Sequence, residues 1–299
     1  MADLNSRPAV LCTGMGGVLG EGLSHLAPAK GSRWIVAGRK PPQAWSEFPF
    51  QLCDLSHPKE ISSMMVEIRP RVLLHAAAMS KVDACESQPD LARRINVESV
   101  AEALAVAKKI DAKVVFISTD QVFDGQKLGY TEDTPVSPLH EYGRTKVMAE
   151  ALVLAAGGTV IRIPLLLGPQ ISPNRRGADA WLVAAARRQE SLGLFTDEFR
   201  AVAAARLLAA PIHGLVERPL PGIFHLAGAT AVSRWQLGVE ACAAAQVNMI
   251  HYQRSLENWQ GPAKPPHLHL LCQRAEKEIG FQPPDLRQSL TVLYGPPHV

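Results

Sequence analysis

Residues Pro8-Ala-Val-Leu-Cys-Thr-Gly-Met-Gly-Gly-Val-Leu-Gly20 decide the fold of this 299-residue chain. The apolar run at 8–13 is typical of a buried parallel strand. Four glycines follow it, three at G-x-x-G-x-x-G spacing and one in addition: Gly14, Gly17, Gly20 and Gly16. Leucines then recur at helical spacing: Leu19, Leu23 and Leu26. The segment therefore predicts a strand, a tight turn and a helix.

The glycine turn is a candidate site for a pyrophosphate. A backbone without Cβ atoms can approach a phosphate closely, and the helix that follows offers its positive N-terminus. The alternative is a tight strand–helix turn that binds nothing. The strand–turn–helix setting favours the cofactor interpretation, and we include Val18 and Leu19, which lie within the turn, among the cofactor-binding residues.

Strand and helix patterns alternate along the rest of the first half. Short apolar runs predict strands at 34–37, 72–75, 114–117 and 159–163, with another just before Asp54. Helical patterns lie between them at about 58–68, 90–109 and 141–156. Such alternation predicts βαβ units and right-handed crossovers. The expected fold is α/β, a doubly wound parallel sheet of the Rossmann type.

The pattern changes after Pro169. Residues 169–200 look irregular, with turn-formers at Pro169, Pro173 and Gly177. A helix near 201–217, a strand at 222–226 and a helix near 233–245 follow, and the tail from 260 is rich in Pro and His. We therefore expect a dinucleotide-binding domain over 1–168. Residues 169–299 should form a smaller C-terminal substrate-binding region, with some elements returning to the first domain.

Composition excludes several classes of protein. Hydrophobic residues make up 47% and charged residues 20%, which suits a globular chain with a sizeable core. The net charge of +3 is spread along the chain, so no basic run indicates nucleic acid. No apolar stretch is long enough to predict a membrane span, and the polar opening residues Met1–Pro8 predict no secretory signal.

The five cysteines are widely separated, without metal-ligand spacing. They favour buried thiols in a reducing compartment, so we expect a cytoplasmic location and no metal.

Cofactor choice should be decided at the end of the second strand. An NAD site usually has an acidic residue there for the ribose 2′-hydroxyl, whereas this chain has Arg39 and Lys40. Two cations could pair with a 2′-phosphate, which favours NADP over NAD. A solvated basic turn is the alternative. Asp54, followed by Leu55, could accept a hydrogen bond from adenine or cap the next helix.

The fourth strand ends in His75-Ala-Ala-Ala78. The small residues Ala76, Ala77 and Ala78 would let a dinucleotide lie across the sheet edge, although ordinary helix–sheet packing also uses small residues. Asn96 lies in the following helical segment, where Asn usually faces solvent or marks a local kink.

Thr119, Tyr142 and Lys146 are candidates to carry chemistry. Tyr142 and Lys146 are four residues apart, so a helix would place the phenol and the ammonium on one face. Free tyrosine has a pKa of about 10, and a nearby ammonium would lower it. Tyr142 could then protonate a carbonyl oxygen as a hydride reaches its carbon, with the Thr119 hydroxyl orienting that oxygen. A lone YxxxK is usually a surface pair, but here it follows a strand that ends in Ser-Thr.

The chain resembles the extended short-chain dehydrogenase/reductase superfamily, and within it the dTDP-4-dehydrorhamnose reductase group. The segments that carry this resemblance keep the family order: Thr13-Gly-Met-Gly-Gly-Val-Leu-Gly20, His75-Ala-Ala-Ala-Met-Ser-Lys-Val-Asp-Ala-Cys-Glu86, Ser118-Thr-Asp-Gln-Val-Phe-Asp-Gly125, Tyr130-Thr-Glu-Asp-Thr-Pro-Val-Ser-Pro138 and Tyr142-Gly-Arg-Thr-Lys-Val-Met-Ala-Glu150. The C-terminal third fits more loosely, through Thr196-Asp-Glu-Phe-Arg200 and Gly222-Ile-Phe-His-Leu-Ala-Gly228.

The resemblance implies roles for individual residues. Thr119, Tyr142 and Lys146 would form the catalytic triad, with Asn96 in a supporting water-relay position, and Lys146 would also hold the nicotinamide ribose. Expected substrate-binding residues follow the same motifs: Thr119, Asp120, Gln121 and Arg200. Arg200, like Arg175 and Arg176, is a candidate to meet phosphates, with simple surface solvation as the alternative.

Two departures from the family pattern concern the substrate. Gln121 stands where the family has an aromatic residue, and Arg162-Ile-Pro-Leu-Leu-Leu-Gly168 lacks the usual Trp and Tyr. Aromatic surfaces that could contact a sugar nucleotide are thus missing at both places. The Arg-Ile-Pro segment also resembles the regulatory β subunit of methionine adenosyltransferase.

We therefore expect an NADP-dependent oxidoreductase, with NAD as the alternative cofactor, that reduces the 4-keto group of a nucleotide-linked sugar. The alternatives are a non-catalytic NADP-binding regulatory subunit and a nucleotide-sugar epimerase. A sugar nucleotide is the expected small-molecule partner, with no nucleic acid or membrane. The sequence leaves the oligomeric state open, a homodimer included.

Overall fold

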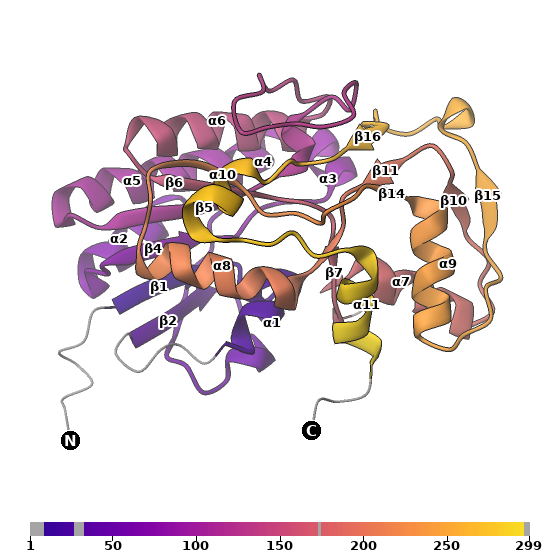
Figure 1. Cartoon of the computed structure of the whole chain (residues 1–299). Helices are drawn as coiled ribbons and strands as arrows, with labels where there is room; N and C mark the ends of the chain where they lie inside the picture. The colour runs from indigo at the N-terminus through magenta and orange to yellow at the C-terminus, as the bar shows by residue number, and fades with distance from the viewer. Residues whose placement is uncertain (1–8, 27–32, 173–174, 296–299) are drawn as a thin grey trace.

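The computed structural model describes residues 9–26, 33–172 and 175–295. The expectations at Met1–Pro8 and at Pro173 lie outside these ranges. A central sheet of seven strands, in the order β13-β6-β5-β4-β1-β2-β3, dominates the molecule (Figure 1). Its strands are β1 (Ala9–Thr13), β2 (Arg33–Gly38), β3 (Phe50–Leu52), β4 (Val72–His75), β5 (Lys113–Thr119), β6 (Thr159–Ile163) and β13 (Gly222–His225).

All neighbouring strands of this sheet are parallel. The strand order reverses between β1 and β4, and ligands bind at such a switch point in doubly wound folds. The predicted doubly wound parallel sheet is thus confirmed. β13 comes from the C-terminal part of the chain and pairs with β6 from Gly222↔Thr159 to His225↔Arg162.

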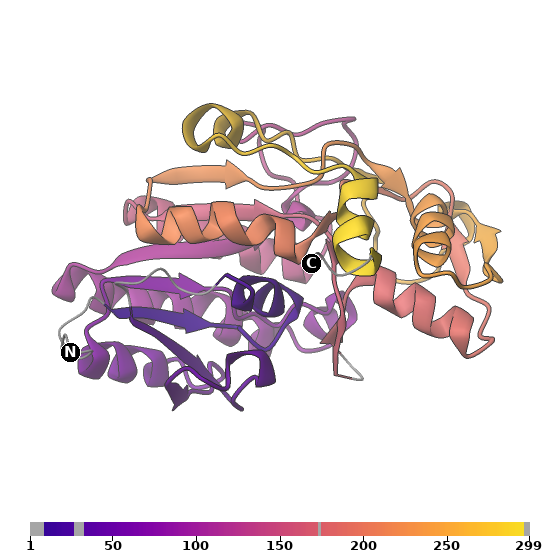
Figure 2. The same cartoon turned by 60° about the horizontal axis from the view of Figure 1, so that its bottom comes forward.

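Helices cover both faces of the sheet (Figures 1 and 2). On one face, α1 (Val18–Ser24) packs against α8 (Ala205–Glu217), and the buried core there includes Leu19, Leu23 and Leu208. The helices of the other face are α2 (Lys59–Ile68), α5 (Ser99–Ile110) and α6 (Glu141–Ala155). Their apolar faces are buried because a parallel sheet needs cover on both sides.

A smaller region lies beyond the carboxyl ends of the strands (Figure 1). Its helices are α7 (Ala178–Arg187), α9 (Arg234–Ala244) and α11 (Leu286–Tyr294), and they share a separate apolar cluster. Short strands complete it: β7 (Leu166–Leu167), β8 (Gln170–Ser172), β9 (Arg175–Arg176), β10 (Gly193–Phe195), β11 (Phe199–Arg200), β12 (Ala203–Ala204), β14 (Val232–Ser233), β15 (Tyr252–Arg254) and β16 (His267–Leu268). A further helix, α10 (Gln273–Ile279), contacts β13.

Two details differ from the sequence-based expectations. The supposedly irregular stretch 169–200 contains α7, whose Leu182, Val183 and Ala186 are buried. The prolines and Gly177 predicted turns in this stretch, but Gly177 is the N-cap residue of α7. The single helix expected at 90–109 is three segments, α4 (Pro89–Arg93), a π-helical turn η3 (Arg94–Glu98) and α5.

Within the described ranges, no helix is long and apolar enough to cross a membrane. All five cysteines are buried free thiols, as their scatter along the sequence predicted.

Candidate active site

The first glycine of the turn is where β1 approaches the segment after β4. Gly14 has a φ of 81°, and a Cβ there would lie 2.4 Å from the backbone of Ala76 and Ala77. The Thr13 hydroxyl accepts a hydrogen bond from the Ala77 amide at 3.3 Å. The structure thus brings Gly14 against Ala76 and Ala77 at the carboxyl ends of β1 and β4, with no room for a side chain on Gly14.

Gly14→Ala should therefore destabilise the protein, by about 1–3 kcal/mol, within the usual range for strain and overpacking. Gly157→Ala is a matched control, because Gly157 also has a positive φ of 70° but no atom within 4 Å of its Cβ position. Chemical denaturation of both variants separates backbone strain from the steric clash. Equal losses in the two variants would show that the contact with Ala76 and Ala77 carries no cost.

The other glycines serve different contacts. A Cβ on Gly20 would lie 2.1 Å from the Met15 carbonyl oxygen, so Gly20 lets α1 pack tightly on the turn. A Cβ on Gly16 would lie 2.7 Å from Arg175, whose Nη1 donates to the Gly16 carbonyl at 3.1 Å. Arg175, expected as a substrate-phosphate candidate, therefore contacts the glycine turn. Of the other turn residues, Leu19 is buried in the core and Val18 begins α1.

The residues expected to select the cofactor lie after β2 and β3. Arg39 and Lys40 are exposed, directly beyond Gly38. Asp54 Oδ1 accepts the Ser56 amide at 3.0 Å, which is the main reason that its pKa is lowered, and the charge of Arg39 lowers it further. The alternative that Asp54 caps the next helix is wrong, because α2 has Pro58 as its N-cap.

The neighbouring Leu55 is 8% exposed and packs in the core. Its side chain is thus part of the apolar cluster beneath α2, and a contact to a cofactor would have to come from its backbone.

Thr119 lies at the carboxyl end of β5 and is the N-cap of a short 3-10 turn, η4 (Asp120–Val122). Its hydroxyl accepts the Gln121 amide at 3.2 Å and donates to Asp120 Oδ1 at 3.1 Å. Asp120 is 2% exposed, and burial raises the pKa of its carboxyl to about 6. The turn therefore places the Thr119 hydroxyl next to the Asp120 carboxyl, which is partly protonated near pH 6.

Tyr142 and Lys146 occupy adjacent turns of α6 and reach the end of β5, as predicted. Lys146 is 2% exposed, and its Nζ donates to the Ile117 carbonyl at 2.6 Å and lies 3.8 Å from the centre of the Phe116 ring. The Thr119 side chain lies close enough to the phenol of Tyr142 to affect its pKa. The three triad candidates thus converge.

The expected effect of Lys146 on the pKa of Tyr142 is wrong for this structure. Burial raises the pKa of the phenol, the neighbouring Thr119 side chain offsets this only in part, and the charge of Asp120 raises it further. Burial also lowers the pKa of Lys146 to about 7, although the charge of Glu150 acts to raise it. The amine is therefore only partly protonated at neutral pH. The phenol therefore stays protonated at neutral pH, as a proton donor must be, although a raised pKa makes it a weaker acid.

Asn96 is buried, contrary to the solvent-facing alternative, and the π-helical turn η3 marks the kink. Its Oδ1 accepts the Met79 amide at 2.8 Å, and its Nδ2 donates to the Met79 carbonyl and to Thr145 Oγ1, both at 3.0 Å. The Thr145 hydroxyl in turn donates to the Tyr142 carbonyl at 2.8 Å. Asn96 thus ties the loop after β4 to the helix that carries Tyr142.

Gln121, at the position where the family pattern is aromatic, is held by a histidine. His140 is the N-cap of α6, and its Nδ1 accepts the Gly143 amide at 3.1 Å. Its other ring nitrogen must then carry the proton, which it donates to Gln121 Oε1 at 2.8 Å. The side-chain oxygen of Gln121 is thus occupied by His140, and its side-chain Nε2 offers hydrogen-bond donors where the family's aromatic ring would offer an apolar face.

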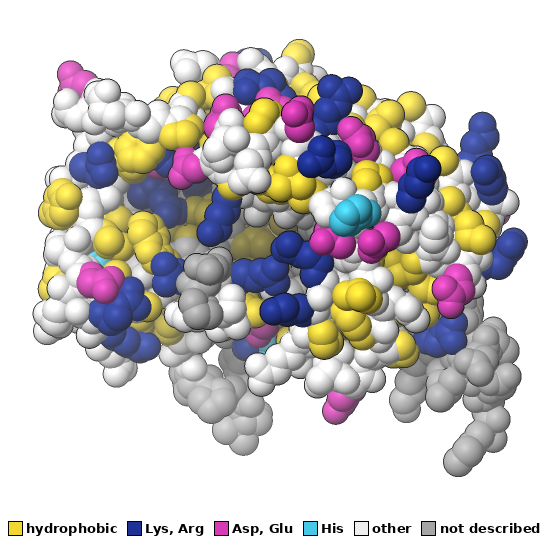
Figure 3. Space-filling view, turned by 180° about the vertical axis from the view of Figure 1, so that it is seen from behind, with side chains coloured by type: hydrophobic (Ala, Val, Ile, Leu, Met, Phe, Trp, Pro, Cys, Tyr) yellow, Lys and Arg dark blue, Asp and Glu magenta, His cyan; other side chains and the backbone are white. Residues whose placement is uncertain are grey.

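Arg200 comes to this site from the C-terminal region. It is 3% exposed, forms an ion pair with Glu198 at 3.0 Å, and its charge lowers the pKa of Asp120. Figure 3 shows, from behind, a hollow in the middle of the molecule with an apolar floor and several Lys and Arg side chains around it. The surroundings of this hollow favour an anionic ligand.

The sequence analysis did not predict the buried ion pair between Arg162 and Glu150. Arg162 on β6 donates from Nε and Nη2 to the carboxylate of Glu150 on α6, at 3.0 and 2.7 Å. Its Nη1 lies 3.3 Å from His225 Nε2, and His225 Nδ1 lies 3.1 Å from the Leu271 carbonyl. A charged residue in the apolar run Thr159-Val-Ile-Arg-Ile163 was the signal that could have revealed it.

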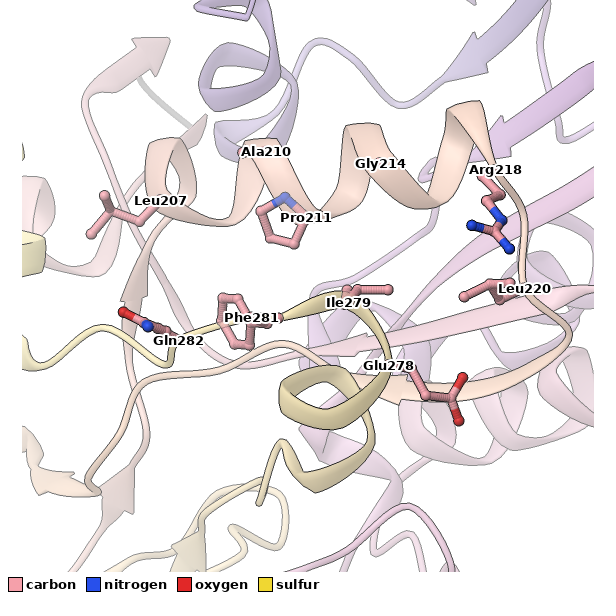
Figure 4. A pocket seen from close by; sticks show the side chains of 11 residues that line it. Leu207, Ala210, Pro211, Gly214, Arg218, Leu220, Glu278, Ile279, Phe281 and Gln282 are labelled. Carbon is pink, nitrogen blue, oxygen red and sulfur yellow. The ribbon is translucent and has the colours of Figure 1, made fainter.

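A second hollow lies between α8 and residues 278–282 (Figure 4). Apolar side chains dominate its lining, among them Leu207, Pro211, Ile279 and Phe281, with Arg218 and Glu278 near one end. It contains none of the predicted site residues, so the candidate chemistry does not take place there. No group of three or more His, Cys, Asp or Glu that could hold a metal ion occurs in the part of the chain that the structure describes.

The fold and the convergence of Thr119, Tyr142 and Lys146 define an α/β protein of the extended short-chain dehydrogenase/reductase class. Residues 8–295 match the family described as RmlD substrate binding domain, and the chain belongs to this family.

The chain is similar both to dTDP-4-dehydrorhamnose reductases and to a subunit of methionine adenosyltransferase. A dTDP-4-dehydrorhamnose reductase of Burkholderia thailandensis is 28% identical, and the alignment covers 94% of this chain and 96% of that protein. The solved structure of a hypothetical dTDP-4-dehydrorhamnose reductase from Sulfolobus tokodaii is 27% identical, with a TM-score of 0.81 and coverage of 93% and 97%. Methionine adenosyltransferase 2 subunit beta of Rattus norvegicus is 35% identical over 161 residues, 53% of this chain and 47% of that protein.

Proposed function

We propose that this chain is a nicotinamide-dependent oxidoreductase that reduces the carbonyl of a nucleotide-linked keto sugar, with a 4-keto sugar such as dTDP-4-dehydrorhamnose as the substrate class. The convergence of Thr119, Tyr142 and Lys146 at the end of β5 carries this proposal. Membership of a family that includes dTDP-4-dehydrorhamnose reductases supports it. The buried free thiols suit a reducing compartment, so the cytoplasm is the proposed location.

The residues around the glycine turn fit a dinucleotide. Gly14, Gly16 and Gly17 leave backbone accessible, and Ala76–Ala78 lie across from them at the switch point of the sheet. Lys146, at the end of β5, is the residue proposed to hold the nicotinamide ribose. When bound, the nicotinamide would supply the hydride for carbonyl reduction.

Side chains of the protein would position the oxygen of the reacting carbonyl and protonate it. The Thr119 hydroxyl lies beside the Tyr142 phenol, so the two can face one oxygen between them. Tyr142 remains protonated at neutral pH because burial raises its pKa, and it can donate its proton to that oxygen as negative charge develops there. Thr119 can fix the position of the oxygen by turning its hydroxyl proton from Asp120 to it, and Asn96 holds the helix of Tyr142 through Thr145.

Purified chain, NADPH and dTDP-4-dehydrorhamnose test the proposal directly. Loss of NADPH absorbance that depends on the sugar nucleotide is the expected result, with the reduced sugar nucleotide identified by mass spectrometry. Absence of turnover with saturating cofactor and substrate would reject this substrate class.

A regulatory role is the second candidate function, favoured by the likeness to methionine adenosyltransferase 2 subunit beta. A regulatory subunit would bind the cofactor and a methionine adenosyltransferase without reducing a sugar nucleotide. Size-exclusion chromatography with a methionine adenosyltransferase, run beside the turnover assay, distinguishes the two. A stable complex without turnover would favour regulation.

NADPH should bind more tightly than NADH, because the exposed Arg39 and Lys40 offer two cations where an NAD site has a carboxylate. Replacing both with Ala should cost about 1–3 kcal/mol of NADPH binding, through lost charge-assisted hydrogen bonds to the 2′-phosphate. NADH affinity should barely change. Isothermal titration calorimetry with both cofactors measures the difference.

Lys108 and Lys109 provide the control. They are exposed in the last turn of α5, which leads into the opposite, amino-terminal edge of the sheet. Replacing both removes the same charge without touching the proposed site, so both affinities should be kept. Equal affinity of the unaltered protein for NADPH and NADH would contradict the proposed selection.

A further inference from the structure

The glycine turn has no cation of its own. From Thr13 to Gly20 the chain contains no Lys or Arg, so a pyrophosphate at the turn would meet only backbone N–H groups from this segment. Gly16, Gly17 and Val18 are half-buried, so this part of the turn is open to a ligand. A cation that offsets the charge of the two phosphates would therefore come from another segment of the chain.

Arg175 on β9 reaches the turn from 159 positions away. Its Nη1 donates to the Gly16 carbonyl at 3.1 Å. The side chain is exposed, and among the described residues it forms no ion pair with a carboxylate. A guanidinium carries several N–H donors in a rigid, planar fork, so the bond to Gly16 leaves most of them available to a ligand at the same place.

The segment that carries Arg175 is fixed close to the turn. A Cβ on Gly168 would lie 2.6 Å from Val18 Cγ1, so the chain just before β8 packs directly against the start of α1. The Gly168 amide donates to Oδ1 of the buried Asp179 at 2.8 Å, and the Tyr294 hydroxyl donates to Oδ2 at 2.7 Å. β8 and β9 then pair as antiparallel strands. The fold itself therefore holds β9 beside the glycine turn.

We propose that Arg175 binds the pyrophosphate of the dinucleotide, with Nη1 kept on the Gly16 carbonyl and the remaining N–H groups donating to phosphate oxygens. This inference rests on the proposed function, but only on its nicotinamide cofactor. The guanidinium fork matches the geometry of a phosphate, and charge-assisted hydrogen bonds are stronger than neutral ones. A residue from beyond Pro169 thus completes the cofactor site, whereas the sequence suggested Arg175 for the substrate.

The neighbouring Arg176 lies elsewhere. Successive side chains of a strand point to opposite sides. The pKa of Glu190, beyond the end of α7, is lowered mainly by a hydrogen bond from Arg188, and the charge of Arg176 lowers it further. Arg176 is thus near this carboxylate, while Arg175 contacts the glycine turn. Of these two residues, we assign Arg175 alone to the pyrophosphate.

Three ligands test the assignment. NADPH and NADH both contain the pyrophosphate, whereas 2′-AMP has the adenosine and the 2′-phosphate without it. Arg175→Ala should weaken NADPH and NADH by about 10- to 100-fold each, the usual contribution of hydrogen bonds to a charged group, and leave 2′-AMP unchanged. Replacing Arg39 and Lys40 should instead weaken NADPH and 2′-AMP but not NADH. Nicotinamide fluorescence measures the two dinucleotides, and competition with NADPH measures 2′-AMP.

Arg188→Ala is the matched control. Arg188 is the exposed C-cap residue of α7 and pairs with Glu190 at 2.8 Å. Its replacement removes the same charge from the same region without touching the turn, so all three affinities should be kept. Thermal unfolding without ligand shows whether each variant retains the fold.

Salt separates a contact with phosphate from a brace on the turn. Raising the salt from about 0.01 M to about 1 M shortens the Debye length from about 30 Å to about 3 Å. The ratio of NADPH affinities between the unaltered protein and Arg175→Ala should therefore shrink. A ratio that stays constant would mean that Arg175 acts only through its bond to the Gly16 carbonyl, because a hydrogen bond to a neutral group is insensitive to screening.

The outcomes keep the inference apart from the proposed function. Unchanged affinity of Arg175→Ala for NADPH and NADH overturns the inference, and so does a loss of 2′-AMP binding as large as the loss for NADPH. The assays need no turnover. A protein that binds NADPH through Arg175 but reduces no sugar nucleotide therefore supports the inference while the proposed reaction fails. An unaltered protein that binds neither dinucleotide overturns both.

Discussion

Tyr142→Phe should lower turnover by about 10²–10⁴-fold, the usual contribution of a positioned acid–base group. The substitution removes the transferable proton but keeps the ring, which stacks at 6.2 Å from the His140 ring. Cofactor binding should survive, because the phenol lies at the end of β5 and the pyrophosphate is expected at the glycine turn. Steady-state kinetics with NADPH and dTDP-4-dehydrorhamnose, together with calorimetric NADPH binding, measure the two effects separately.

Two neighbouring variants sharpen this result. Lys146→Met should impair both turnover and cofactor binding, because its ammonium is expected to hold the nicotinamide ribose. Thr119→Val should lower turnover and keep the fold, at a cost of about 1–2 kcal/mol in the free energy of unfolding, because it keeps the shape of the side chain but removes the cap of η4 and the hydrogen bond to Asp120. Tyr252→Phe removes a phenol that is 57% exposed in β15 and should change neither quantity.

The outcome for Tyr142 decides the catalytic assignment. Unchanged turnover of Tyr142→Phe on a substrate that the unaltered protein reduces would show that the phenol is not the proton donor. Asp120, with a pKa of about 6 beside Thr119, would then be the next group to consider. Loss of NADPH binding in Tyr142→Phe would instead mean that the ring positions the cofactor.

The Rossmann part of the fold follows closely from local sequence. The apolar runs that predicted strands at 72–75 and 159–163 coincide with β4 and β6, because fully buried parallel strands are short, continuous apolar segments. The helix expected at 141–156 is α6, Glu141–Ala155. The convergence of Thr119 with Tyr142 was predictable since the carboxyl ends of parallel strands and the helices that follow them meet at one edge.

The features that sequence reasoning missed depend on contacts between distant segments. α7 follows a glycine and prolines that indicated turns, and its stability comes from packing in the C-terminal cluster. The raised pKa of Tyr142 depends on the surroundings of the phenol in the folded chain, which the four-residue spacing to Lys146 does not report. The contact of Arg175 with Gly16 spans 159 positions of the chain and has no local signature.

Breaking the buried ion pair between Arg162 and Glu150 should strongly destabilise the helix that carries the site. Both side chains are at most 4% exposed, and the pair is bidentate. Glu150→Ala should lower the free energy of unfolding by about 3–5 kcal/mol, because it leaves the guanidinium of Arg162 buried and unpaired. That is a large share of the total stability of a typical domain, about 5–15 kcal/mol. Urea denaturation followed by circular dichroism measures it.

Arg144→Ala is the matched control on the same helix. Its side chain is 47% exposed and pairs with Glu141 at 2.8 Å and with Glu86 at 3.5 Å. Solvent screens such pairs, so the loss should stay below about 1 kcal/mol. A loss of similar size in Glu150→Ala would show that the buried pair is no more stabilising than a surface one.

Replacing both partners separates the cost of an orphaned charge from the value of the ion pair. The double variant Glu150→Leu, Arg162→Met fills the same space with apolar side chains and should recover most of the stability lost in Glu150→Ala, because neither charge is then buried alone.

The same double variant also tests whether Glu150 affects cofactor binding. The charge of Glu150 raises the pKa of Lys146, one helical turn away, so removing it should lower that pKa further below about 7. Cofactor binding that depends on the Lys146 ammonium should then weaken at neutral pH even though the fold is restored. A double variant that is stable but binds NADPH as the unaltered protein does would show that Glu150 serves the fold alone.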